Sequence, residues 1–213
     1  MDKILTLKNL LALLAILSLT EPVLAQTLET KPTEEQIARG FVMQHDGKMI
    51  FTPCRDRSYA TVDDLSPNST VTSSLQTLGL GAGKTLYVEF IGQSDQDMLR
   101  VSMINFARTK TRCQLGGGPD ELWRATGSNP SWTLVAGAGQ LLLKREAMPD
   151  IKLSYAEIRT QKTTTQILTP ERSGAEWYFH RQVCHDQGAA MIFGWQAELK
   201  IDGMLLHGCA WQR

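Results

Sequence analysis

The sequence predicts a mainly β protein built from two small antiparallel barrels or sandwiches. Short runs rich in β-branched and aromatic residues recur along the chain after residue 38, and turn residues separate them. Gly116-Gly117-Gly118-Pro119 interrupts this pattern near its middle, because three glycines and a proline stop regular structure. We therefore expect one domain over residues 38–114 and a second over residues 119–213.

The first predicted domain opens with a β-hairpin. Apolar-rich runs flank Asp46-Gly47, and Asp-Gly in such a position favours a tight turn with positive φ. Before the hairpin, Thr33-Glu34-Glu35-Gln36 fits a capping box and predicts a short helical turn inside a flexible lead-in over residues 26–37. After the hairpin we expect a helix at 70–78 and strands at 59–62, 86–91 and 99–106.

The second predicted domain is a succession of short strands. Turn signals such as Gly127-Ser128-Asn129-Pro130 and Asp202-Gly203 separate them, a spacing typical of an antiparallel barrel or sandwich. All five tryptophans lie in this segment, and we expect them in its core. The expected strands are 121–125, 132–135, 140–144, 152–155, 164–168, 176–181, 191–200 and 204–209.

The first 25 residues resemble a secretory signal peptide. Lys3 and Lys8 precede an apolar run of about ten residues, which is too short to span a bilayer but is the usual length of a signal-peptide core. Val23-Leu24-Ala25 then supplies small residues for cleavage after Ala25. We therefore expect export to the periplasm and, after signal cleavage, no stable membrane insertion.

The charge of the chain is balanced, with 22 basic and 22 acidic residues. Zero net charge argues against a nucleic-acid partner, which would require a basic face to neutralise phosphates. It also argues against a polybasic membrane anchor. The expected partner is an envelope protein or a small ligand whose identity the sequence leaves open.

The four cysteines are Cys54, Cys113, Cys184 and Cys209. An even number in an exported chain suggests two disulfides, and four cysteines allow three pairings among which the sequence alone does not choose. The domain boundary favours Cys54–Cys113 and Cys184–Cys209, one disulfide in each domain. Each would stabilise the fold by about 3–4 kcal/mol on a loop-entropy model.

Three histidines near the last two cysteines form the candidate metal site. His180 and His185 flank Cys184, while His207 and Cys209 lie two apart on one face of an expected strand. A mixed His/Cys site would suit zinc or copper. The favoured alternative is a Cys184–Cys209 disulfide with ordinary surface histidines, and hence no cofactor.

Catalytic motifs do not emerge from the sequence. Gly79-Leu80-Gly81-Ala82-Gly83-Lys84-Thr85 looks like a phosphate-binding loop, but its glycine spacing is wrong and a strand is expected to follow it. The chain contains no Gly-x-Ser-x-Gly elbow. Cys184 beside His185 could act as a nucleophile only as a free thiol, so we expect no enzyme.

The C-terminal segment resembles bacterial envelope proteins that are largely uncharacterised and, more distantly, the small META/HslJ-type β domains. The resemblance rests on residues 127–132, on Cys184-His185-Asp186 and on the Asp-Gly…Gly-Cys ending at residues 202–209. Ser128 and Ser131 replace the acidic and aromatic residues usual in that group.

The first segment resembles the OB-like domain of NlpE-type envelope lipoproteins. Residues 40–43, 51–54, 57–59 and 86–92 carry this resemblance, which implies an OB-like barrel. NlpE-type proteins are linked to envelope stress sensing and to copper, but the chain lacks their lipid-anchor cysteine and their Cys-x-x-Cys pair.

Together these observations predict a non-enzymatic periplasmic binding or accessory protein of the cell envelope. One such role would be in the envelope stress response. One alternative is a copper or zinc handling protein that uses His180, His185 and His207. Another is a cell-wall hydrolase or an inhibitor of one.

Overall fold

The computed structural model describes residues 34–109, 112–113, 118–186 and 190–213. Residues 33–213 group into one compact unit. The described chain forms a sheet system of fourteen strands with a single α-helix, so the predicted mainly β fold class is confirmed. The expected signal peptide and its expected cleavage site lie outside the described residues. Among these residues, no helix combines the length and apolar character needed to cross a bilayer.

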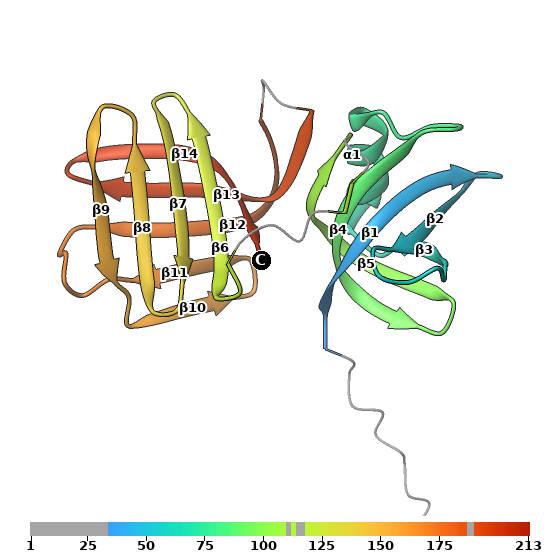
Figure 1. Ribbon diagram of the computed structural model, residues 1–213, viewed down its shortest axis with the longest axis horizontal. Coiled ribbons are helices and arrows are strands. Elements are labelled where there is room, and N and C mark those ends of the chain that lie inside the picture. The colour runs from blue at the N-terminus through green and yellow to red at the C-terminus, as the bar shows by residue number, and fades with distance from the viewer. Residues whose placement is uncertain (1–33, 110–111, 114–117, 187–189) are drawn as a thin grey trace, which may run out of the picture. The chain divides into compact units, whose positions relative to one another are not determined.

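The first half is a closed five-stranded barrel (Figure 1). Its order is β3-β2-β1-β4-β5, and a parallel pairing of β3 with β5 closes it. Asp46 and Gly47 both have positive φ and connect β1 to β2, which confirms the predicted hairpin. The strands are β1 (Gln36–His45), β2 (Lys48–Pro53), β3 (Ala60–Asp64), β4 (Thr85–Asp95) and β5 (Met98–Arg108).

The start of β1 differs from the expectation for the lead-in. Gln36 already pairs with Gly92 of β4, so the strand begins within the range assigned to the flexible segment. The helical turn expected from the capping-box pattern is absent over residues 34–36, whereas Thr33 lies outside the described residues. Pairing with β4 satisfies the backbone groups of Gln36 and Ile37 and replaces the local helix.

The helix α1 (Thr70–Leu78) lies between β3 and β4 and matches the predicted range. The Asp64 carboxylate accepts hydrogen bonds from the backbone N–H of Ser66 (2.9 Å) and of Thr72 (2.8 Å), which fixes the turn into the helix. Burial opposes ionisation of Asp64, but hydrogen bonds from Ser66 and Thr72 outweigh it and hold its pKa below the usual value. Gly79 ends the helix with φ 106°, and a strand follows.

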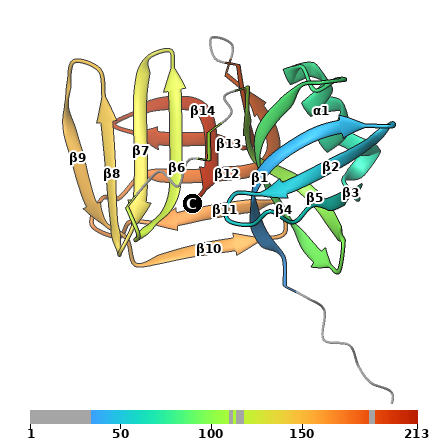
Figure 2. The same ribbon diagram turned by 45° about the vertical axis from the view of Figure 1, so that its right-hand side comes forward.

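The second half is an antiparallel succession of nine strands in the order β10-β11-β12-β13-β14-β6-β7-β8-β9. Figure 1 shows β6 to β9 side by side. Figure 2 shows that β10, β11 and β12 also lie side by side. The strand β10 was not predicted. The strands are β6 (Glu121–Ser128), β7 (Ser131–Gly137), β8 (Gln140–Arg145), β9 (Met148–Ser154), β10 (Glu157–Gln161), β11 (Thr164–Leu168), β12 (Glu176–His185), β13 (Met191–Ile201) and β14 (Met204–Gln212).

Strand β13 belongs to both halves. Its first residues, Met191 to Phe193, pair with β5, and its later residues pair with β14. The change of partner takes place at Gly194, where a Cβ would lie 2.0 Å from the Ile104 carbonyl oxygen. A glycine is therefore required for β13 to pass so close to β5.

Each half has its own apolar core. Val42, Leu75 and Phe90 are fully buried in the barrel, and Trp177, Phe179 and Leu143 are fully buried in the second half. A third cluster, which contains Tyr87, Phe106, Phe193 and Cys209, lies where β13 joins β5. Phe106 packs at 5.3 Å from the Phe193 ring, so aromatic contacts accompany the strand pairing.

Candidate functional site

The segments singled out in the second half converge on one cleft of about 450 Å³, here called the polar cleft. Its walls come from the end of β6 (residues 126–129), the end of β12 (residues 184–186) and the middle of β14 (residues 207–209). Gln196 and Ala197 of β13 complete it. Asn129 and Cys184 are 55 residues apart in the sequence. The antiparallel pairings of β12 with β13, of β13 with β14 and of β14 with β6 bring the three segments together.

A disulfide between Cys184 and Cys209 lines the polar cleft. The two cysteines lie on β12 and β14, the strands that flank β13, with Cys209 opposite Gln196. The disulfide therefore ties together the two strands on either side of β13. In this oxidised state neither sulfur can act as a thiolate ligand or as a nucleophile.

Two of the three predicted metal-ligating histidines line the polar cleft, namely His185 and His207. His180 does not line it, because its Nδ1 lies 3.4 Å from the Thr164 hydroxyl and its ring stacks on Tyr178. The described residues hold no group of three or more His, Cys, Asp or Glu side chains placed to bind a metal ion. The three histidines thus do not form one cluster.

Two glycines of the polar cleft make room for a buried tryptophan. A Cβ on Gly127 would lie 2.2 Å from Nε1 of Trp132, and one on Gly208 would lie 2.7 Å from its Cζ2. Trp132 is only 2% exposed, and its Nε1 has no hydrogen-bond partner among the described residues. Gly127, interpreted from the sequence as a turn residue, instead lies within β6 and permits close packing.

The remaining polar side chains of the polar cleft supply hydrogen-bond donors as well as acceptors, the carboxylate among them acting only as an acceptor. They comprise the hydroxyls of Thr126 and Ser128, the amides of Asn129 and Gln196, and the Asp186 carboxylate. Sequence reasoning did not identify Gln196 or Thr126, because nothing in their local pattern marks them. Such a set is suited to binding a small polar molecule.

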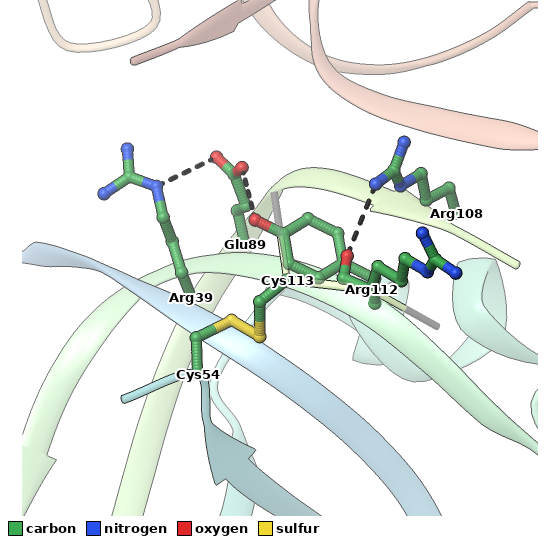
Figure 3. The surroundings of a disulfide bond; sticks show 7 residues. Arg39, Cys54, Glu89, Arg108, Arg112 and Cys113 are labelled. Carbon is green, nitrogen blue, oxygen red and sulfur yellow. Dashed lines mark hydrogen bonds and ion pairs between the residues drawn. A yellow bond between two sulfur atoms is a disulfide. The ribbon is translucent and has the colours of Figure 1, made fainter. Parts of the chain in front are cut away.

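The second disulfide, Cys54–Cys113, adjoins a buried charged network (Figure 3). Glu89 is 2% exposed and accepts hydrogen bonds from the Tyr87 hydroxyl (2.9 Å) and from Nδ2 of Asn105 (3.1 Å). Nε of Arg39 lies 3.5 Å from its carboxylate. These contacts compensate the burial of a negative charge.

The same network connects the barrel to the end of β14. Asn105 on β5 donates to the carbonyl oxygen of Gln212 (2.8 Å) and accepts from the backbone N–H of Gln212 (2.9 Å). Burial, followed by the negative charge of Glu89, raises the pKa of the Tyr87 phenol above its usual value. The Arg108 guanidinium lies over the Tyr87 ring at 5.3 Å. The network is therefore structural in character.

The cysteines pair as the predicted domain boundary favours, one disulfide within each half.

Comparison of the chain with models of known protein families, with curated proteins and with solved structures found no match.

Proposed function

We propose that this protein is an exported, non-enzymatic binding or accessory module of the bacterial cell envelope, and that the polar cleft is its ligand site. The observation that carries the proposal is the convergence of three separated segments on one disulfide-lined cleft. These are the segments on which the resemblance to bacterial envelope proteins rests. A site assembled from distant segments and held by a covalent bond is suited to binding, because its geometry is fixed in advance.

The proposal also takes up the two family resemblances of the sequence. The barrel places its helix between β3 and β4 and closes through β3 and β5, which agrees with an OB-like domain. The antiparallel strands after residue 120 agree with a META/HslJ-type domain. Two formed disulfides fit a protein that works in the periplasm after cleavage behind Ala25.

The proposed ligand is a small polar molecule that offers both hydrogen-bond donors and acceptors. A volume of about 450 Å³ falls within the usual range of ~300–1,000 Å³ for ligand pockets. Amide side chains such as Asn129 and Gln196 bind neutral polar groups, as in sugars and peptides. Fragments of the cell wall contain both sugars and peptides and are therefore the first probes to use.

The test is a titration with two probes, an N-acetylglucosamine trimer and a muramyl dipeptide, followed by calorimetry. His207→Ala removes an imidazole from the polar cleft, and His45→Ala is its matched control on β1. We expect the His207 variant to weaken binding of the responding probe about tenfold, whereas the His45 variant leaves it unchanged. Equal affinities for both variants and the unmodified protein would exclude the polar cleft as the site.

A second candidate function is copper or zinc binding, because His185 and His207 share the polar cleft. Titration with Zn²⁺ or Cu²⁺ alone supports it if each His→Ala change lowers the affinity. The absence of binding at micromolar metal would end it. A cell-wall hydrolase, or an inhibitor of one, would be revealed by release of soluble fragments from cell walls or by inhibition of added lysozyme.

A further inference from the structure

A second hollow, here called the apolar groove, has a volume of about 700 Å³. It lies between β5, β12 and the segment that leads into α1. Its walls contain Leu65, Val71, Met103, Ile104 and Val183. Val71 and Ile104 are almost fully buried, but Leu65 is 59% exposed. The groove therefore has a deep apolar wall and an apolar side chain at its rim, and none of its lining belongs to the polar cleft.

A bulge in β12 contributes one wall of the groove. The pairing register of β12 with β13 shifts between Arg181 and Cys184, so that Gln182 and Val183 fall outside the regular ladder. Bulges commonly redirect side chains at functional positions. Here the bulge residues line the groove together with Met103 and Ile104 of β5.

Positive charge gathers at the β12 side of the groove. Nη2 of Arg181 donates to the Ser102 hydroxyl (2.7 Å) and lies 3.5 Å from the Glu35 carboxylate. Lys162, in the turn between β10 and β11, also lines the groove and forms no ion pair with the described residues. The charged side chains that line the groove are Glu35, Lys162 and Arg181, which leaves an excess of one positive charge.

We propose that the apolar groove binds a long-chain fatty acid, with its hydrocarbon chain against the β5 and β12 walls and its carboxylate at Arg181 and Lys162. Charge complementarity selects this class of ligand: the walls remove methylene groups from water, and the excess positive charge is free for one carboxylate. The Arg181 guanidinium uses Nη2 both for its hydrogen bond to Ser102 and for its ion pair with Glu35, so its other nitrogens can donate to the ligand. This inference concerns a different site from the proposed function.

The first experiment compares oleate with oleyl alcohol, which has the same chain but no charge. Displacement of a fluorescent fatty-acid probe from the purified protein reports both affinities. We expect oleate to bind with a stoichiometry of one and about tenfold more tightly than the alcohol, since charge-assisted hydrogen bonds are the stronger kind. Equal affinities would overturn the proposal, because the positive charge would then have no role.

Matched variants locate the binding site. Lys162→Gln should weaken oleate binding about threefold, whereas Lys152→Gln on the exposed face of β9 should leave it unchanged. Leu65→Asp places a negative charge at the rim and should weaken it tenfold or more, with Leu205→Asp at another exposed leucine as the control. Lys162 and Leu65 are exposed, so both variants are expected to fold.

Three further outcomes are decisive. Oleate binding that His207→Ala leaves unchanged supports a site separate from the polar cleft. Oleate binding that is seen only after removal of the residues before Thr33 would mean that the chain itself occupies the groove, and it would overturn the proposal. Equal loss of oleate affinity in each variant and its control would overturn it as well.

Discussion

Replacement of Gly208 by alanine should destabilise the protein through a backbone collision. Gly208 lies on β14 beside β6, and an added Cβ would lie 2.1 Å from the Thr126 carbonyl oxygen and 2.7 Å from Cζ2 of Trp132. Ordinary contacts of a Cβ begin near 3.4 Å, so the two strands would have to separate by more than an ångström. Neighbouring strands are only about 4.8 Å apart, and a shift of this size lengthens the hydrogen bonds between them.

The expected loss of stability is about 3 kcal/mol. Overpacking in a close-packed region costs about 1–3 kcal/mol, and each weakened backbone hydrogen bond adds about 1 kcal/mol. For a protein of this size, such a loss lowers the melting temperature by about 6–12 °C. Alanine loses less backbone entropy than glycine when a strand forms, which offsets less than about 1 kcal/mol of this loss of stability.

Urea denaturation followed by far-UV circular dichroism measures this effect. Gly81→Ala is the matched control, because nothing lies within 4 Å of its added Cβ and its φ is not in the left-handed region. The control should change the free energy of unfolding by less than about 0.5 kcal/mol. A Gly208 variant as stable as the control would refute the argument that this glycine permits the close approach of β14 to β6.

Three other predictions concern stability. The double change Cys184→Ala/Cys209→Ala should lower the free energy of unfolding by about 3.5 kcal/mol, given the separation of 25 residues, and an unchanged urea midpoint would contradict the loop-entropy argument. Glu89→Ala should lower the free energy of unfolding by about 3 kcal/mol because it leaves Arg39 without its buried partner. In the same urea denaturation, the control Glu157→Ala, at an exposed residue, should lower it by less than about 0.5 kcal/mol. The pKa of Asp64 is lower in the folded protein than in the unfolded chain, where it is about 3.9. Its ionised form therefore stabilises the protein above that pH, and this contribution is lost as the pH falls through the pKa of the folded state. Asp64→Asn should therefore reduce stability at pH 7, and thermal melts should show this reduction shrinking as the pH falls below the unfolded pKa. A reduction that stays the same as the pH falls would count against this linkage.

Local patterns were enough to predict most of the fold. The apolar runs on either side of Asp46-Gly47 identified the first hairpin, and the helix at 70–78 was predicted with its observed bounds. Strand β10 was missed because Ile158 is its only apolar residue and its other residues are exposed. A strand at the edge of a sheet that buries so little has no alternating pattern to detect.

The candidate site could be predicted only in part. Cysteine positions and the domain boundary favoured the observed disulfides, and the motif segments around Cys184 and Cys209 do meet. The roles of Gly194 and Gly208 were not visible, because a close approach between strands depends on partners far away in the sequence. For the same reason, no local pattern could show that β5 and β13 pair or that a groove adjoins that junction.

The two edges of the nine-stranded sheet have a consequence for self-association. An unpaired strand edge offers free backbone groups to a second molecule, and proteins oppose this with prolines and charged side chains. Edge strand β9 carries Pro149, Asp150 and Lys152, while edge strand β10 carries Glu157 and Arg159. Both edges thus discourage strand addition between molecules, so the protein should stay monodisperse at concentrations at which an apolar edge would seed aggregates.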